Sequence, residues 1–254
     1  MSKKIIGAQR DLVKYAHEYG HLAFEDIQED ARRIEIVKAL ETFSWNSIIE
    51  VGCGNMSILA KIKNYENAAI IEPITDFLQK NFSEFNFDSR VTGFNGTLSQ
   101  YASTFDEKWD ICLLSSLLHE VEDQKGMLDD CRKILKPNGT LIVNVPNAYS
   151  IHRILAVNKG LIKNVFEISE TQKLMQQGLA PFSNQSLSEL LCENGFTISK
   201  MYTIIPKLLD HNNLSRLLNS GKISMDFLRQ INELSGEIEP FGSEILVLAH
   251  KATE

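Results

Sequence analysis

Short, mostly apolar runs recur along this chain, and they constrain its fold more than any other feature. Five of them lie at residues 47–51, 68–71, 90–94, 109–114 and 140–145. Strands that are apolar throughout, rather than alternately apolar and polar, are typical of a parallel sheet that helices cover on both faces. Segments of helical character separate the runs, so the sequence predicts an α/β fold.

The rest of the chain surrounds this core, and we expect one domain over residues 1–254. The expected parts are an N-terminal helical segment at residues 1–46 and a core at residues 47–145. Two helical insertions are expected at about 148–180 and 206–240, and two closing strands at 196–205 and 244–249. In the N-terminal segment, apolar positions three or four residues apart between Phe24 and Phe43 indicate an amphipathic helix.

Composition and charge exclude several classes of protein. Of the 254 residues, 43% are hydrophobic and 23% are charged, which is ordinary for a globular protein and excludes bulk disorder. The formal net charge of −7 disfavours a basic nucleic-acid platform. No apolar run approaches the length of about 18 residues that a membrane span needs, and the N-terminus turns polar at once. We therefore expect a cytoplasmic protein without a membrane span.

The four cysteines are Cys53, Cys112, Cys131 and Cys192. They lie far apart and form no Cys-x-x-Cys pair. This spacing favours reduced, mostly buried thiols over a disulfide framework or a zinc site.

The most informative segment joins the first apolar run to a Gly-x-Gly turn. Gly52, Cys53 and Gly54 follow that run directly, and glycines let a backbone approach a ligand closely. A short helix is expected near residues 56–62, and its first N–H groups suit a polar or anionic group. Glu72 ends the second run, where a carboxylate can accept hydrogen bonds from both hydroxyls of a ribose. Together these residues predict a site for a nucleoside-bearing cofactor.

The spacing of the glycines argues against a dinucleotide. A dinucleotide site would carry Gly-x-Gly-x-x-Gly, whereas Ser57 stands at the third glycine position of that pattern. Dinucleotide-binding folds also usually begin with this strand, and here 46 residues precede it. An NAD-dependent oxidoreductase is therefore kept only as an alternative.

At these residues the chain resembles the class I S-adenosylmethionine-dependent methyltransferases. Their first motif is an acidic residue, any residue and then Gly-x-Gly-x-Gly, which Glu50, Gly52 and Gly54 match, with Met56 in place of the third glycine. Further matches follow in the family's order at Glu72, Asn95-Gly96-Thr97, residues 105–112 and residues 135–140. The resemblance implies a Rossmann-like, seven-stranded, mostly parallel sheet with helices on both faces and helical lid insertions. Its last strand is antiparallel and inserted between the fifth and the sixth.

The resemblance also implies a cofactor and its binding residues. S-adenosyl-L-methionine is the expected cofactor, and S-adenosyl-L-homocysteine its product. The positions expected to bind it are Glu50, Gly52, Cys53, Gly54, Glu72, Pro73, Asn95, Gly96, Thr97, Ser115 and Tyr19. Tyr19 would bring an aromatic ring near the positive sulfur, although an ordinary amphipathic helix explains it equally well. No group of acidic ligands follows the fourth run, so no metal is expected, and Asp110 is interpreted as structural.

Two histidines are the catalytic candidates. His119 lies just beyond the fourth run and His152 after the fifth. An imidazole with a pKa near neutrality could take a proton from a substrate hydroxyl as its oxygen attacks the methyl group. The alternative for His119 is a histidine packed against the sheet or bonded to Glu120 or Glu122.

The sequence thus predicts methyl transfer to a small polar molecule by a bacterial enzyme. We expect O-methylation of a hydroxyl in a sugar, surface-polysaccharide or natural-product pathway, with no nucleic-acid or membrane partner. The sequence does not indicate the oligomeric state. The alternatives are an N-methyltransferase acting on a small amine, an RNA methyltransferase, an oxidoreductase and a catalytically silent binding protein. Apolar residues of the insertions either line a pocket or form the insertions' own core: Met175, Leu179, Phe182, Leu208, Leu209 and Leu217.

Overall fold

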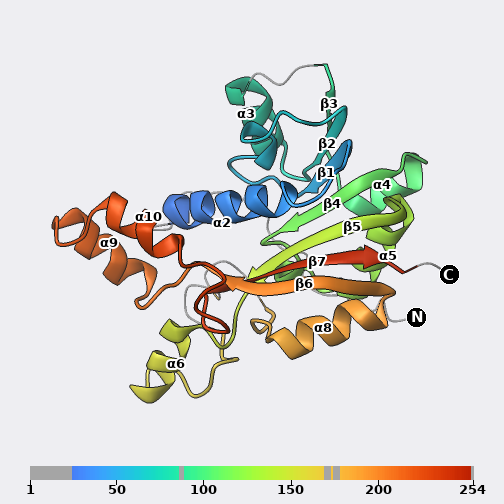
Figure 1. Cartoon of the computed structure of the whole chain (residues 1–254). Coiled ribbons are helices and arrows are strands. Elements are labelled where there is room, and N and C mark those ends of the chain that lie inside the picture. Colours follow the sequence, from blue (N-terminus) through green and yellow to red (C-terminus); the bar gives the residue numbers. More distant parts are fainter. Residues whose placement is uncertain (1–24, 86–88, 169–172, 174–177, 253–254) are drawn as a thin grey trace, which may run out of the picture.

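The apolar runs form neighbouring strands of one sheet in the computed structural model, which describes residues 25–85, 89–168, 173 and 178–252 (Figure 1). The strands are β1 (Ser47–Val51), β2 (Asn67–Ile71), β3 (Val91–Phe94), β4 (Trp109–Ser115), β5 (Leu135–Pro146), β6 (Phe196–Ile204) and β7 (Glu244–Lys251). Their order in the sheet is β3-β2-β1-β4-β5-β7-β6. Strands β1 to β5 form the parallel part of the sheet, whereas β7 runs antiparallel to both β5 and β6. The predicted seven-stranded sheet is confirmed, including its antiparallel last strand.

Helices cover both faces of this sheet. They are α2 (Glu25–Leu40), α3 (Thr75–Phe85), α4 (Leu98–Thr104), α5 (Gln124–Ile134), α6 (Ile151–Asn158), α8 (Asn184–Glu193), α9 (His211–Asn219) and α10 (Met225–Asn232), with short 3-10 helices η1 (Ile58–Ala60) and η2 (Leu118–Glu120). Side chains of α4, α5 and α8 pack on one face, and those of α2 and η1 pack on the other. Helices α6, α9 and α10 lie beyond one edge of the sheet, at the left in Figure 1.

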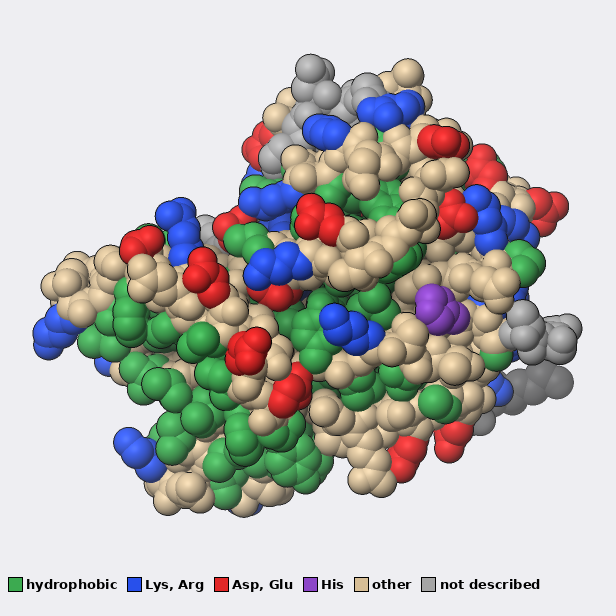
Figure 2. Space-filling model, in the orientation of Figure 1, with side chains coloured by type: hydrophobic (Ala, Val, Ile, Leu, Met, Phe, Trp, Pro, Cys, Tyr) green, Lys and Arg blue, Asp and Glu red, His purple; other side chains and the backbone are tan. Residues whose placement is uncertain are grey.

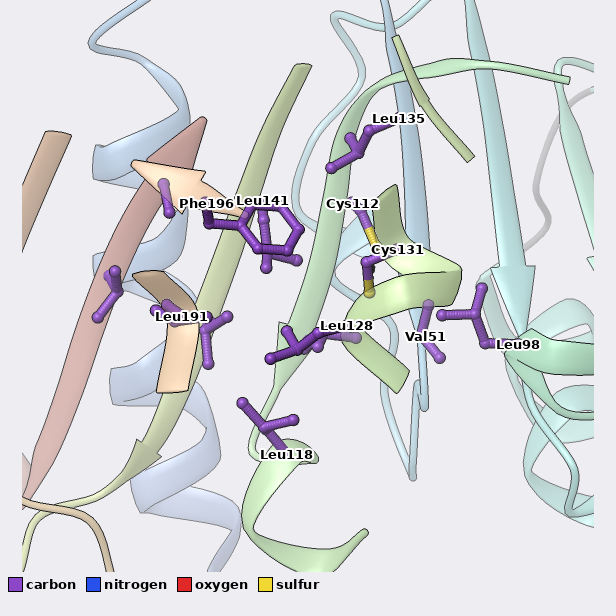
Figure 3. Close-up of a cluster of buried hydrophobic side chains, with 14 of the residues drawn as sticks. Val51, Leu98, Cys112, Leu118, Leu128, Cys131, Leu135, Leu141, Leu191 and Phe196 are labelled. Atoms are coloured by element: carbon purple, nitrogen blue, oxygen red, sulfur yellow. Dashed lines mark hydrogen bonds between the residues drawn. The ribbon is translucent and has the colours of Figure 1, made fainter. Parts of the chain in front are cut away.

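Burial on both faces explains why the central strands of the sheet are mostly apolar. Successive residues of a strand point to opposite faces. Along β4, Cys112 and Leu114 join one cluster of buried side chains, whereas Ile111 and Leu113 join the other. Figure 3 shows the first cluster, in which Cys112 packs against residues of α5. Each fully buried aliphatic side chain contributes roughly 1.5–3 kcal/mol to stability, so this sheet supplies most of the apolar core.

Two local features differ from the predictions. The helix expected near 56–62 is only the single turn Ile58–Ala60. The helix ends at Lys61, and Ile62 and Tyr65, which precede β2 in the sequence, are buried. The fifth strand begins earlier than predicted, since Leu135 already pairs with Trp109. The expected turn therefore lies inside the strand as an irregularity, with Asn138 at a φ of 62°.

Three cysteines are buried, as predicted, and Cys192 is exposed. The Sγ atoms of Cys112 and Cys131 lie 3.7 Å apart in the core (Figure 3). No described helix combines the length and the apolar composition that crossing a membrane requires. The predicted N-terminal lid, including Tyr19, lies outside the described residues.

One edge of the sheet collects polar residues from many parts of the chain. Glu72 and Asn147 directly follow the parallel strands β2 and β5. Because β7 is antiparallel, its first residue lies at this same edge, where Glu244 is the partner of Pro146. Lys207 follows the end of β6 there as well. The topology thus brings together residues that are up to about 170 positions apart.

A buried ion pair joins α2 to this edge. Arg32 Nε and Nη2 donate to the two carboxylate oxygens of Glu244 at 2.8 and 2.7 Å, and Gln28 Nε2 donates to Glu244 Oε1 at 2.6 Å. Burial alone would raise the pKa of Glu244, but the charge and hydrogen bonds of Arg32 hold that pKa below its usual value. The pair therefore stays ionised and fixes α2 against β7.

Removing one partner of this pair should be costly. We expect Arg32→Met to lower the free energy of unfolding by about 3–5 kcal/mol, because it leaves a buried carboxylate uncompensated. The double variant Arg32→Met/Glu244→Gln should recover part of this loss. The control is the exposed ion pair of Lys61 and Asp30, where Lys61→Met should cost less than about 1 kcal/mol. Urea unfolding measures all three, and an equal loss for Arg32→Met and Lys61→Met would contradict the account.

Candidate active site

A cavity of about 570 Å³ lies at this edge of the sheet. One side of it is formed by the loops that follow β1, β2 and β4. The other side is formed by α2, α6 and the segment 207–213, which leads into α9. The volume lies within the range of about 300–1,000 Å³ that is typical of small-ligand sites. This cavity is the candidate active site.

The Gly-x-Gly turn forms one wall of the cavity. Gly52 and Gly54 have φ angles of 77° and 55°, which residues with a side chain rarely adopt. No described atom lies within 4 Å of the position that a Cβ of Gly54 would take, whereas a Cβ of Gly52 would lie 3.3 Å from Leu117. The left-handed positions of this turn are thus the two glycines. Met56 stands outside them, so a side chain there needs no backbone strain.

The amide groups after this turn are bound by the protein itself. The Ser57 hydroxyl donates to the Glu50 carboxylate, and Ile58 N donates to Glu50 Oε1 at 3.1 Å. Ser57 N donates to Asn81 Oδ1 at 2.6 Å, and Asn81 Nδ2 donates to Gly54 O at 2.9 Å. The polar and anionic groups that these amides were expected to bind are therefore parts of the protein itself, the Asn81 side chain and the Glu50 carboxylate. Glu50 and Asn81 order the turn.

Burial governs the ionisation of the groups below the turn. It raises the pKa of Glu50 to about 7, although the hydrogen bond from Ser57 acts in the opposite direction. Burial also raises the pKa of Cys53, and the neighbouring charges of Glu50 and Glu72 raise it further. Cys53 therefore stays a neutral thiol, and it is not a nucleophile at neutral pH.

Glu72 ties the second loop to the first. Its Oε1 accepts from Ile74 N at 2.9 Å and its Oε2 accepts from Gly54 N at 3.3 Å. The side chain lines the cavity but is only 3% exposed, and burial raises its pKa. A carboxylate has about four acceptor sites, so capacity for a ligand remains.

The other predicted cofactor residues divide into two groups. Cys53, Pro73 and Ser115 line the cavity, as Glu50, Gly52, Gly54 and Glu72 do. Asn95, Gly96 and Thr97 do not line it. Asn95 Nδ2 donates instead to Glu72 O at 2.9 Å, and Thr97 caps α4 through Gln100. These residues therefore support the loop that carries Glu72 from behind.

Both catalytic candidates reach the cavity. His119 lies in η2, is 2% exposed, and has its Nε2 at 3.8 Å from Glu120 Oε1. His152 lies in the first turn of α6. Burial lowers the pKa of His152 to about 2, and the positive charges of Lys207 and Arg153 act in the same direction. The predicted near-neutral pKa is thus wrong for His152, which is an uncharged and very weak base at neutral pH.

Several residues that line the cavity, most of them on the side formed by α2, α6 and the segment 207–213, were not predicted from the sequence. They are Gln28, Arg32, Asn147, Lys207, His211 and Glu244. The antiparallel last strand was the available signal, since it places the start of β7 beside the end of β5. Of the insertion residues, Leu208 and Leu209 line the cavity, whereas Phe182 is buried in the core. Leu179 and Leu217 are not in the lining, and Met175 lies outside the described residues.

Asp110 has the structural role that the sequence suggested. Its Oδ2 accepts from Ser47 N at 2.9 Å and its Oδ1 accepts from Lys136 Nζ at 2.9 Å. It lies at the start of β4, at the opposite edge of the sheet from the cavity. In the described parts of the chain, no group of three or more His, Cys, Asp or Glu side chains is arranged to hold a metal ion.

A family model described as a methyltransferase domain matches residues 15–200. The chain belongs to this methyltransferase family. Together with the order of its strands, the match makes it a class I S-adenosylmethionine-dependent methyltransferase, as its motifs predicted, and S-adenosylmethionine is its cofactor. No curated protein matches the chain.

Solved structures with the same fold span nearly the whole of this methyltransferase. The N-methyltransferase NodS from Bradyrhizobium japonicum, solved with S-adenosyl-L-homocysteine, is 13% identical, with a TM-score of 0.60 over 95% of this chain and 99% of NodS. A chain from the complex of the Haloferax volcanii Trm112 activator with a methyltransferase is 13% identical, with a TM-score of 0.64 over 97% and 100%. The [4+2]-cyclase SpnF is 12% identical, with a TM-score of 0.56 over 87% and 80%. At such identities the likeness concerns the fold alone.

The cavity fits the cofactor of this methyltransferase. The two left-handed glycines leave open space where a side chain would otherwise stand at Gly54. A buried carboxylate, Glu72, lines the same space, and its hydrogen bonds to the turn fix its position. Open space at the backbone beside a fixed acceptor suits a nucleoside that carries an extended tail.

The raised pKa of Glu50 predicts a particular dependence of stability on pH. The pKa rises from 4.5 to about 7 on folding, so between these values the folded state keeps a proton that the unfolded state has lost. The free energy of unfolding should therefore fall as pH rises through this window. Glu50→Gln keeps an acceptor for Ser57 but cannot ionise. We expect wild type to lose stability relative to Glu50→Gln between pH 5 and pH 8, as measured by urea unfolding; a constant difference would contradict this.

Proposed function

We propose that this methyltransferase transfers a methyl group from S-adenosylmethionine to a hydroxyl of a small acceptor molecule. One observation carries the proposal. A single cavity is lined by Gly54 and Glu72, by His119 from the segment after β4, and by His152 and Lys207 on the opposite side. A donor bound beside Gly54 and Glu72 would therefore share one cavity with an acceptor bound beside His119, His152 and Lys207.

In the first half of the cavity, the predicted residues would hold the cofactor. Glu72 would accept hydrogen bonds from the ribose hydroxyls, and the backbone of Gly52 to Gly54 would accommodate the neighbouring part of the molecule. When bound, S-adenosylmethionine supplies a methyl group activated by a positive sulfur. The chain's own task is to align the acceptor and exclude water, and well-oriented reactants reach effective molarities of about 10⁵–10⁸ M.

The second half of the cavity supports a small molecule as the acceptor. It is enclosed by α2, by α6 and by the segment 207–213, which belongs to the second helical insertion. A cavity of about 570 Å³ that is walled in this way suits a compact ligand better than a nucleic acid or a protein surface. The acidic formal charge of −7 also disfavours RNA.

We assign the role of general base to His119 rather than His152. A hydroxyl must lose its proton as its oxygen is methylated, and an imidazole in contact with the acceptor can receive it. The low pKa of His152 makes it a poor proton acceptor. His119 lies beside Glu120, whose carboxylate would stabilise the imidazolium that forms.

The assignment of Glu72 can be tested by binding. We expect Glu72→Ala to weaken the binding of S-adenosyl-L-homocysteine by about 1–3 kcal/mol, because a buried ribose would lose its charged acceptor. The control is Glu84→Ala, which removes an exposed carboxylate from α3. Isothermal titration calorimetry measures both variants. An unchanged affinity in Glu72→Ala, with the fold intact by circular dichroism, would remove Glu72 from the site.

The reaction can be tested by following a labelled methyl group. The protein would be incubated with methyl-labelled S-adenosylmethionine in four separate reactions. One contains small hydroxylated compounds, one small amines, one transfer RNA and one a protein extract. We expect label in a small hydroxylated compound. Label in amines alone would replace the proposal with N-methylation, and label in RNA or protein alone would contradict a small acceptor.

The base can be tested on the acceptor found in this way. We expect His119→Asn to lower kcat by about 10²–10⁴-fold while leaving the affinity for S-adenosyl-L-homocysteine unchanged. The control is His250→Asn, since His250 is exposed near the far end of β7, with Nδ1 at 3.1 Å from Thr140 Oγ1. Equal turnover in His119→Asn and wild type would make His119 a structural residue.

A further inference from the structure

We propose that Arg33 of α2 binds the carboxylate at the amino-acid end of the cofactor, and that its ion pair with Glu29 fixes the guanidinium group for this role. The inference rests on the proposed function, because it adds a residue to the half of the cavity that would hold S-adenosylmethionine. It comes from a buried ion pair in the cavity wall that none of the sequence motifs predicted.

The cofactor ends in a charged group that needs partners of its own. In S-adenosylmethionine the sulfur joins the ribose to an amino-acid chain, which carries an ammonium and a carboxylate at neutral pH. Glu72 would account for the ribose, but not for this second end. A carboxylate that leaves water for a cavity requires charged or N–H donors.

The amides of the glycine turn are largely unavailable for this carboxylate. Three of them already donate to side chains of the protein, those of Gly54, Ser57 and Ile58. Each backbone amide carries a single hydrogen, so these bonds leave it no second one to donate. The carboxylate therefore needs another donor on this side of the cavity.

Arg33 has N–H groups that the protein does not use. The residue lines the cavity and is only 8% exposed. Its Nη1 donates to Glu29 Oε2 at 3.1 Å, and this is the one hydrogen bond that its side chain makes with the residues that the structure describes. A guanidinium group carries five N–H groups in a planar fork that matches the two oxygens of a carboxylate. Arg33 can therefore keep Glu29 and bind a carboxylate as well.

The face of α2 that carries Arg33 is turned towards the glycine turn. Burial raises the pKa of Glu50, and the positive charge of Arg33 acts in the opposite direction, so the two side chains lie near one another. Ile36 follows Arg33 by three residues, on the same side of the helix. It belongs to the same buried cluster as Cys53 and Ile58 of the turn and also lines the cavity. Figure 1 shows α2 running towards β1, which ends in this turn.

The other basic residues in the described lining lie elsewhere. Arg32 is bonded to β7 through two hydrogen bonds. Arg153 and Lys159 lie on α6 and at its end, and Lys207 follows β6. These groups border the part of the cavity that we assign to the acceptor. The guanidinium of residue 33 thus remains as the basic group for the cofactor half.

An ion pair suits an amino-acid group better than a free anion. Glu29 is 5% exposed and lines the cavity beside Arg33, so the wall there presents one charge of each sign. The two charges of the amino-acid end also sum to zero, so binding it leaves no net charge buried. Figure 2 shows acidic and basic side chains interspersed over the region of α2, whereas hydrophobic side chains gather at the lower left, over the region of α6 and α9.

The test uses three nucleosides that differ only at the amino-acid end. S-adenosyl-L-homocysteine carries both charges, its decarboxylated form carries the ammonium alone, and 5′-methylthioadenosine carries neither. Each would be titrated calorimetrically into the full chain. We expect S-adenosyl-L-homocysteine to bind about 10–100-fold more tightly than its decarboxylated form, because hydrogen bonds to a charged group are lost. Equal affinity for these two would overturn the inference.

Variants locate the preference at Arg33. Arg33→Met should bring S-adenosyl-L-homocysteine to the affinity of its decarboxylated form while leaving the binding of 5′-methylthioadenosine unchanged, which a general loss of structure would not do. The control is Arg216→Met, which changes an exposed arginine of α9 and should keep the preference. If the unpaired acid prevents folding, Arg33→Met/Glu29→Gln removes both charges and should show the same loss. A preference that survives in a folded Arg33 variant would place the carboxylate elsewhere.

The two levels of the account fail in different ways. If the three nucleosides bind wild type equally, the role of Arg33 is wrong and the cofactor site beside Glu72 stands. If none of them binds wild type, the proposed cofactor site fails and the role of Arg33 with it.

Discussion

The turn after β1 presents backbone amides inside a protein core, and the arrangement of the site depends on how they are satisfied. Two buried carboxylates do this, Glu50 for Ile58 N and Glu72 for Gly54 N. Buried N–H groups without partners are costly, so each acid fixes the conformation of the turn as well as its position. The consequence is an open stretch of backbone at Gly54 beside a fixed acceptor. The site that we propose for the cofactor is thus shaped by the fold itself.

The antiparallel last strand has a second consequence, which concerns the acceptor. It brings Glu244 to the edge where the parallel strands end, and Glu244 holds Arg32 and hence α2 over the cavity. The same topology returns the chain from β6 at Lys207. Ile205, a β-branched residue, has a φ of 58° there, an uncommon conformation that marks strain next to the site. The wall of the cavity that we propose for the acceptor is therefore built from segments that are distant in sequence.

The sheet could be predicted because strands that are buried on both faces appear in the sequence as apolar runs. Most of its helices could be predicted from the segments of helical character between these runs. The sequence could also predict that the glycine turn and Glu72 lie at one edge of the sheet, because each directly follows such a run; their binding of the cofactor stays a prediction. The supporting role of Asn95 and the low pKa of His152 could not, since both depend on neighbours that the topology supplies, such as Lys207. The single turn in place of the expected helix could not be predicted either, since the chain leaves the helix at Lys61 and buries residues that follow it.

The central claim is that one cavity holds the methyl donor and its acceptor side by side. A crystal structure of the complex with S-adenosyl-L-homocysteine tests it most directly. The account predicts that the ribose hydroxyls contact Glu72 and that the sulfur faces the part of the cavity lined by His119 and His152. A ribose away from Glu72, or a sulfur turned away from both histidines, would contradict it.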